Sequence, residues 1–186
     1  MRIVAGTARR AVLVAPAGQN TRPTSDMARE GLFNILSASI AGARFLDLFC
    51  GSGAVGLEAL SRGASEAVLV DQHKSAIAAT LQNLKKTGLA GAEVMEATAQ
   101  KAIAKLASAG RTFNFIFLDP PYDTHLLEQT LQQISHVSLL EYSGMIIAET
   151  DSKLAVPATP PGFTLVDSRK YGRTSFLLYT HESELK

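Results

Sequence analysis

At residues 45–56 the chain reads Phe45-Leu46-Asp47-Leu48-Phe49-Cys50-Gly51-Ser52-Gly53-Ala54-Val55-Gly56. Residues 45–49 are mostly apolar and predict a buried strand, whereas residues 55–60 open a helix. The three glycines match G-x-G-x-x-G, the spacing of a strand-to-helix turn whose backbone can approach a ligand closely. The stretch therefore predicts a βαβ unit with a ligand-binding turn.

Strand and helix patterns alternate through the rest of the chain. Strands are predicted over 45–49, 67–71, 93–96, 113–118 and 145–149, and helices over 55–60, 75–87, 100–108 and 125–134. Repeated βα units predict an α/β fold, with a mainly parallel sheet and helices on both faces. Two last β-like runs, 163–168 and 175–180, predict an antiparallel hairpin that completes the sheet.

The residues before the glycine turn form a distinct N-terminal part. Runs 2–5 and 11–14 predict a β-hairpin, and a helix is expected to begin near Thr24 or Ser25. Arginines concentrate here, which suits a local contact with nucleic acid as well as it suits a solvated surface. The five arginines are Arg2, Arg9, Arg10, Arg22 and Arg29.

Length and composition bound the class of protein. The 186 residues predict a single domain over 1–186. A lone cysteine, Cys50, excludes an internal disulfide, and the 4 histidines lack ligand spacing, so no metal is expected. No apolar run approaches the ~20 residues that cross a bilayer. We therefore expect a soluble, cytoplasmic protein without membrane contact.

The glycine turn is compatible with two cofactors. Asp71 ends the next strand, 20 residues after Gly51, where its carboxylate can accept from both hydroxyls of a ribose. That arrangement fits a nicotinamide dinucleotide or S-adenosylmethionine. Asp47 favours the second, because a carboxylate attracts the ammonium and sulfonium of S-adenosylmethionine and repels a pyrophosphate.

A second motif, Asp119-Pro120-Pro121-Tyr122, follows the predicted strand 113–118. Each proline fixes its own φ, lacks an N–H and restricts the residue before it, so the turn is stiff and presents free carbonyls. A carboxylate acceptor, a rigid carbonyl and an aromatic face suit a planar base with an exocyclic amine. Ligands of doubly wound sheets bind at the carboxyl ends of the strands. We therefore expect both motifs at one edge.

Together these residues resemble the class I S-adenosylmethionine-dependent methyltransferases that act on exocyclic amines. A closer resemblance, covering nearly the whole chain, is to the RsmD-type family of bacterial 16S ribosomal RNA guanine-N2 methyltransferases. The stretches that carry it are Arg2–Gly6, Thr21–Leu36, Asp47–Gly53 and Asp119–Tyr122, in that order.

The resemblance implies a Rossmann-like fold with a seven-stranded sheet, a C-terminal antiparallel hairpin and an N-terminal hairpin extension, residues 1–23, that contacts RNA. It implies the catalytic residues Asp119, Pro120, Pro121 and Tyr122. S-adenosylmethionine is expected on Asp47, Phe49, Gly51, Ser52, Gly53, Gly56, Asp71, Thr98 and Asp119. Arg9, Arg10, Arg22 and Arg29 are expected to contact RNA. The implied partner is 16S rRNA in the small subunit or its assembly intermediate, bound by a monomer.

One departure and three alternatives accompany this interpretation. The family usually has an acidic residue after the third strand that contacts the adenine of the cofactor, but this chain has Glu96-Ala97-Thr98-Ala99, so Thr98 or the backbone would have to substitute. The alternative functions are an adenine-N6 DNA methyltransferase, a protein-glutamine methyltransferase and a non-catalytic RNA-binding module. The short chain argues against the first, Asp119 in place of Asn against the second, and the intact Asp-Pro-Pro-Tyr motif against the third.

Overall fold

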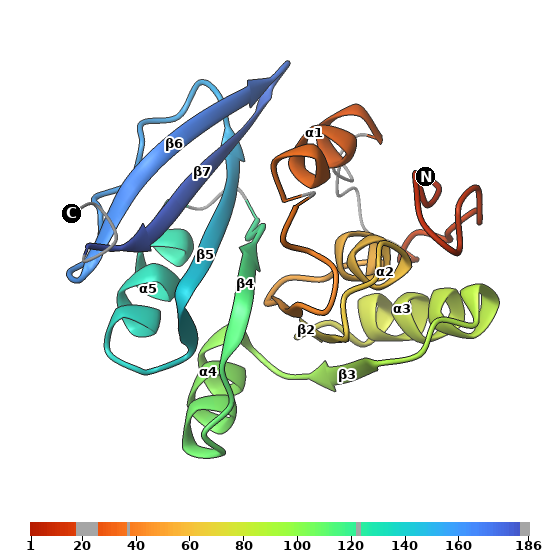
Figure 1. The fold of residues 1–186 in the computed structure, drawn as a ribbon. Helices are drawn as coiled ribbons and strands as arrows, with labels where there is room; N and C mark the ends of the chain where they lie inside the picture. The colour runs from red at the N-terminus through yellow and green to blue at the C-terminus, as the bar shows by residue number, and fades with distance from the viewer. Residues whose placement is uncertain (18–25, 37, 122–123, 183–186) are drawn as a thin grey trace.

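The computed structural model describes residues 1–17, 26–36, 38–121 and 124–182. Within these residues seven strands form one sheet in the order β3-β2-β1-β4-β5-β7-β6 (Figure 1). Five are parallel: β1 (Arg44–Asp47), β2 (Glu66–Asp71), β3 (Ala92–Glu96), β4 (Phe113–Leu118) and β5 (Leu140–Asp151). The antiparallel hairpin of β6 (Phe163–Tyr171) and β7 (Thr174–His181) completes the sheet. The mostly parallel sheet and its C-terminal hairpin are confirmed.

Helices cover both faces of the sheet (Figure 1). On one side lie α1 (Asp26–Leu36), α2 (Ala54–Ser61) and α3 (Lys74–Thr87), and on the other α4 (Ala99–Ser108) and α5 (Thr124–Ser135). One apolar cluster packs α1 and α2 on the sheet, and a second packs α4 and α5. The alternating apolar residues of the strands supply both clusters, as a sheet buried on two faces requires.

Two strands, β5 and β6, extend well beyond their predicted bounds. β5 begins at Leu140 rather than at Met145, because its first half pairs with β4 across a register shift between Phe113 and Phe115. Residues 141–144 are polar or glycine, so an apolar pattern does not mark this part of the strand. The edge strand β6 likewise continues to Tyr171 through exposed polar residues, with a bulge between Leu165 and Asp167.

The predicted N-terminal hairpin is present, but it is held by one bridge and not by two paired strands. A single antiparallel bridge joins Arg2 to Val12, and the Ile3 N–H donates to the Ala11 carbonyl at 2.9 Å. Side chains of α2 and α3 hold this segment by hydrogen bonds. The Asn83 side chain of α3 accepts from the Val14 N–H at 2.8 Å and donates to the Val14 carbonyl at 2.9 Å. The Ser61 hydroxyl donates to the Ala5 carbonyl at 2.6 Å.

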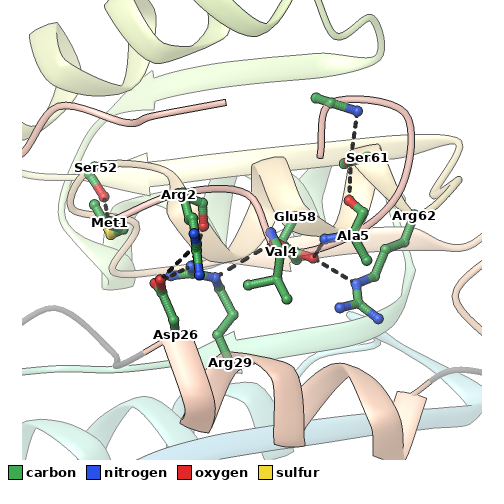
Figure 2. Close-up of polar contacts among 11 residues, drawn as sticks. Met1, Arg2, Val4, Ala5, Asp26, Arg29, Ser52, Glu58, Ser61 and Arg62 are labelled. Carbon is green, nitrogen blue, oxygen red and sulfur yellow. Dashed lines mark hydrogen bonds and ion pairs between the residues drawn. The ribbon is translucent and has the colours of Figure 1, made fainter. Parts of the chain in front are cut away.

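The carboxylate of Glu58, on α2, is the centre of these contacts (Figure 2). It is fully buried, and it accepts from the backbone N–H groups of Val4 at 2.7 Å and Ala5 at 2.9 Å. Arg62 donates to it from the next turn of α2 at 2.8 Å. The guanidinium of Arg29, on α1, lies 3.7 Å away as a buried ion pair.

The prediction that Arg29 contacts RNA is wrong. Its side chain has 0% exposure, and it donates to the Asp26 carboxylate at 2.8 Å and to the Arg2 carbonyl. A guanidinium buried among such partners joins α1 to the N-terminal segment and cannot reach a phosphate in solvent. Arg22, Thr24 and Ser25 lie outside the described residues.

Replacing Glu58 with Ala should strongly destabilise the fold. The substitution removes the acceptor of two backbone N–H groups and one of the two anionic partners of the buried Arg29. Breaking a buried pair in this way costs about 3–5 kcal/mol. The free energy of unfolding from urea denaturation should fall by this amount. Asp167→Asn, which breaks an exposed pair with Arg169, should leave the midpoint nearly unchanged; equal effects of the two substitutions would contradict this role of Glu58.

Candidate cofactor and base site

A cavity of about 360 Å³ lies at the carboxyl edge of the sheet, where β1, β2 and β4 end. It is lined by most of the residues that sequence analysis assigned to the cofactor: Asp47, Phe49, Gly51, Ser52, Asp71, Thr98 and Asp119. Pro120 and Pro121 line it as well. The two motifs predicted to meet at one edge of the sheet therefore share one cavity.

The glycine turn is held in shape by α3. Gly51 and Gly53 have φ of 54° and 77°, values that side chains rarely allow. The Thr80 hydroxyl donates to the Gly51 carbonyl at 3.0 Å, and the Asn83 amide donates to the Ser52 carbonyl at 2.9 Å. Thr80 and Asn83 are fully buried, so the turn is fixed without any ligand.

Two glycines of the motif act in packing and do not line the cavity. A Cβ at Gly56 would lie 2.0 Å from the Leu69 side chain, so this glycine permits close approach of α2 to β2. A Cβ at Gly53 would lie 2.9 Å from Thr80. The third glycine of such motifs commonly serves helix–strand packing. The structure thus separates Gly53 and Gly56 from the predicted residues that face the cavity.

Asp71, at the end of β2, connects the turn to the cavity. One carboxylate oxygen accepts from the Gly51 N–H at 3.0 Å, and the other accepts from the His73 N–H at 2.9 Å. The second oxygen also contacts the His73 ring nitrogen at 3.0 Å, so it is the first oxygen that keeps a lone pair for a further donor. The position and the spare acceptor capacity suit a ligand with adjacent hydroxyl groups.

Asp47 gives the cavity its charge preference. The side chain is 1% exposed, and burial, together with nearby Asp71 and Glu149, raises its pKa to about 8, although the Phe49 N–H, 3.3 Å away, favours the ionised form. A buried carboxylate among other acids is stabilised by a cation. Asp47 therefore favours a positively charged ligand group.

Asp119 directly follows β4 and adjoins the same acids. Burial raises its pKa well above the ordinary range, and Glu149 and Asp47 add to the effect. Because perturbed carboxyls in a cavity are typical of functional sites, this supports the prediction that Asp119 takes part in chemistry. Tyr122, the predicted stacking ring, lies outside the described residues.

The place of the missing acidic contact is occupied by the start of α4. Thr98, Ala99 and Gln100 line the cavity, and the Thr98 hydroxyl caps the helix by accepting from the Lys101 N–H at 3.3 Å. Sequence analysis missed a wall of the cavity formed by Met1, Ala15 and Pro16. No local motif marks these residues; only the tertiary contacts of the N-terminal segment bring them there.

Among the described residues no helix combines the length and apolar character needed to cross a membrane. The same residues contain no group of three or more histidine, cysteine or acidic side chains that could hold a metal ion.

Comparison with known proteins shows close relatives over the full fold. The model of the family described as Conserved hypothetical protein 95 matches residues 1–180. A putative rRNA methyltransferase of Bacillus subtilis, YlbH, is 38% identical over 96% of this chain and 98% of its own. Ribosomal RNA small subunit methyltransferase D of Escherichia coli is 34% identical over 99% of this chain and 91% of its own. The solved structure of the putative methyltransferase yhhF from Escherichia coli, 31% identical, superposes with a TM-score of 0.87 over 98% of both chains.

The raised pKa of Asp47 predicts a pH-dependent stability of the ligand-free protein. Between pH 3.8 and about pH 8 the unfolded chain releases this proton and the folded chain retains it. The free energy of unfolding should therefore fall as pH rises through this window. Asp47→Asn should reduce the fall and make the protein more stable than wild type at pH 8, as measured by urea denaturation at pH 5 and pH 8. An unchanged pH dependence in the variant would contradict the assignment.

Proposed function

The chain belongs to the family described as Conserved hypothetical protein 95, the RsmD-type methyltransferases, and on that premise we propose that it methylates the exocyclic N2 amine of a guanine in small-subunit ribosomal RNA. The observation that carries the proposal is the shared cavity, in which the glycine turn and Asp119-Pro120-Pro121 face one another. Methyltransferase activity on ribosomal RNA follows from the family and the named relatives. The atom and the base that are methylated are the proposal.

The cavity residues fit S-adenosylmethionine. This cofactor, when bound, supplies an electrophilic methyl group on a sulfonium. Asp47 would hold its ammonium, because burial among acids makes a cation the favoured neighbour. Asp71 would accept from the ribose hydroxyls, and Thr98 with the following backbone would contact the adenine. The repulsion between Asp47 and a pyrophosphate argues against the nicotinamide alternative.

Asp119 and Pro120 would position the amine. We expect the guanine to lie in an RNA loop, from which it would be extruded at lower cost than a paired base. Its N2 amine donates to the Asp119 carboxylate and to the Pro120 carbonyl, while Tyr122 stacks on the ring. In the proposed reaction the N2 lone pair would form the bond to the methyl carbon as the carbon–sulfur bond breaks, and the methylated N2 would then release one proton to solvent. Most of the gain in rate would come from positioning of the amine and from stabilisation of the positive charge that develops on N2.

The N-terminal segment would contact the RNA. Arg9 and Arg10 lie in the turn between the two bridged segments, and both are exposed. Free guanidinium groups at an exposed turn are suited to phosphates. We include Arg22 in this contact from the sequence alone. The chain would act as one domain and one copy on the small subunit or its assembly intermediate.

The first experiment uses labelled S-adenosylmethionine and small ribosomal subunits that lack this methylation. After digestion to nucleosides, the label should appear in N2-methylguanosine. Label in N6-methyladenosine would replace the proposal with the adenine alternative. Retained cofactor binding with no transfer to RNA would favour a protein substrate.

Asp119→Ala should abolish methyl transfer while leaving cofactor binding largely intact. In the proposed arrangement Asp119 would contact the base, whereas Asp47 and Asp71, which line the same cavity, would hold the cofactor. Turnover is measured with the labelled assay, and cofactor binding by calorimetry. Equal loss of both would show that Asp119 has no separate role toward the base.

Arg9→Gln should weaken RNA binding without changing turnover at saturating RNA. One lost phosphate contact should reduce the slope of log affinity against log salt by about one. The charge-matched control is Lys105→Gln, an exposed position on α4 at the opposite face of the sheet. If the slope of log affinity against log salt is the same in the two variants, Arg9 does not contact the RNA.

A further inference from the structure

A second, smaller cavity of about 160 Å³ adjoins the first one. Both cavities are lined by Pro120 and Pro121, so the rigid turn contacts each of them. The remaining lining comes from α5 and from the end of β5 with the loop after it: Leu127, Glu128, Glu149, Thr150, Leu154, Ala155, Val156 and Pro157. A molecule in this second cavity would touch the same turn as the cofactor.

The walls of the second cavity are mainly apolar. Pro120, Pro121 and Leu127 form one part, and Leu154, Val156 and Pro157 form another. Leu154 and Val156 are unusually exposed for large apolar side chains, at 39% and 53%. Apolar surfaces of this kind around a small cavity are suited to the faces of a planar ring.

Glu149 of β5 is one of the two acidic residues that line this cavity, and Glu128 of α5 is the other. In the sheet Leu118 of β4 is paired with Ala148 of β5, so Asp119 and Glu149 follow as neighbours at the same edge. Glu149 is 6% exposed and lies 3.4 Å from the Thr174 hydroxyl. A carboxylate accepts several hydrogen bonds at once, so contacts within the protein leave room for a donor from a ligand.

Two adjacent carboxylates match the edge of guanine and oppose that of adenine. Guanine carries the N1–H beside its N2 amine, which gives two neighbouring donors. Adenine has an unprotonated N1 that can only accept. An ionised carboxylate also can only accept, so it bonds to the guanine N1–H and repels the adenine N1.

We propose that the target guanine enters the second cavity with its N1–H donated to Glu149, which makes Glu149 the residue that selects guanine over adenine. This inference rests on the proposed function and adds to it the basis of base selection. The N2 amine then faces Asp119, the neighbour of Glu149 in the sheet. The electrostatic effect of Glu149 on the Asp119 pKa agrees with this proximity.

The test compares guanine with 2-aminopurine, which keeps the amine at position 2 but has an unprotonated N1. Small subunits are reconstituted with RNA that carries either base at the position where wild-type protein places its label. Wild type should prefer guanine in kcat/KM. In Glu149→Gln the amide can donate to the N1 of 2-aminopurine, so the preference should fall by about tenfold to hundredfold. Glu149→Asp, which keeps a carboxylate, should retain part of the preference.

The matched control is Asp151→Asn, which removes an acidic charge two residues further along β5 and outside both cavities. It should keep the wild-type preference. Equal use of the two bases by wild type, or an unchanged preference in Glu149→Gln, would overturn the role of Glu149 even with guanine-N2 methylation intact. Failure of wild type to form N2-methylguanosine would instead overturn the proposed function. Wild-type cofactor binding in Glu149→Gln would show that the variant is folded.

Discussion

The buried carboxylate of Glu58 joins three segments that are far apart in the sequence: the N-terminal backbone, α1 and α2. Since α2 begins directly after the glycine turn, the same contact places Met1 and Pro16 against the cofactor cavity. Arg62 strengthens the junction by donating to Glu58 and by lying over the Phe33 ring of α1, 4.9 Å from its centroid. The wall of the site thus depends on an ion pair whose residues line neither cavity.

The site itself is organised by negative charge at one sheet edge. Asp47 is the last residue of β1, Asp119 directly follows β4, and Glu149 lies near the end of β5; the three strands are neighbours in the sheet. Water is too scarce there to stabilise three carboxylates, and the raised pKa values of Asp47 and Asp119 express this cost. A cationic cofactor and a base that donates N–H groups would offset the charge from two sides. Electrostatic interaction among these carboxylates would therefore couple ligand binding in the two cavities without a conformational change.

The βα alternation made the fold predictable, because buried parallel strands read as short apolar runs and each parallel connection contains a helix. The motif residues at the strand ends were predictable for the same reason. The prediction that Arg29 contacts RNA was wrong because a sequence gives the charge of a residue and not its burial. Only the three-dimensional structure shows that Arg29 pairs with Asp26 and Glu58. The start of β5 was hidden by its polar residues, and the wall formed by Met1 and Ala15 carries no local signal.

The two outer strands of the sheet bear on how copies of the protein meet one another. β3 presents Glu93 and Glu96 to solvent, and β6 combines a bulge at Leu165 and Asp167 with exposed Arg169 and Lys170. Charges and bulges at an edge discourage hydrogen bonding to the backbone of another chain. The sheet is thereby protected against edge-to-edge aggregation on both sides.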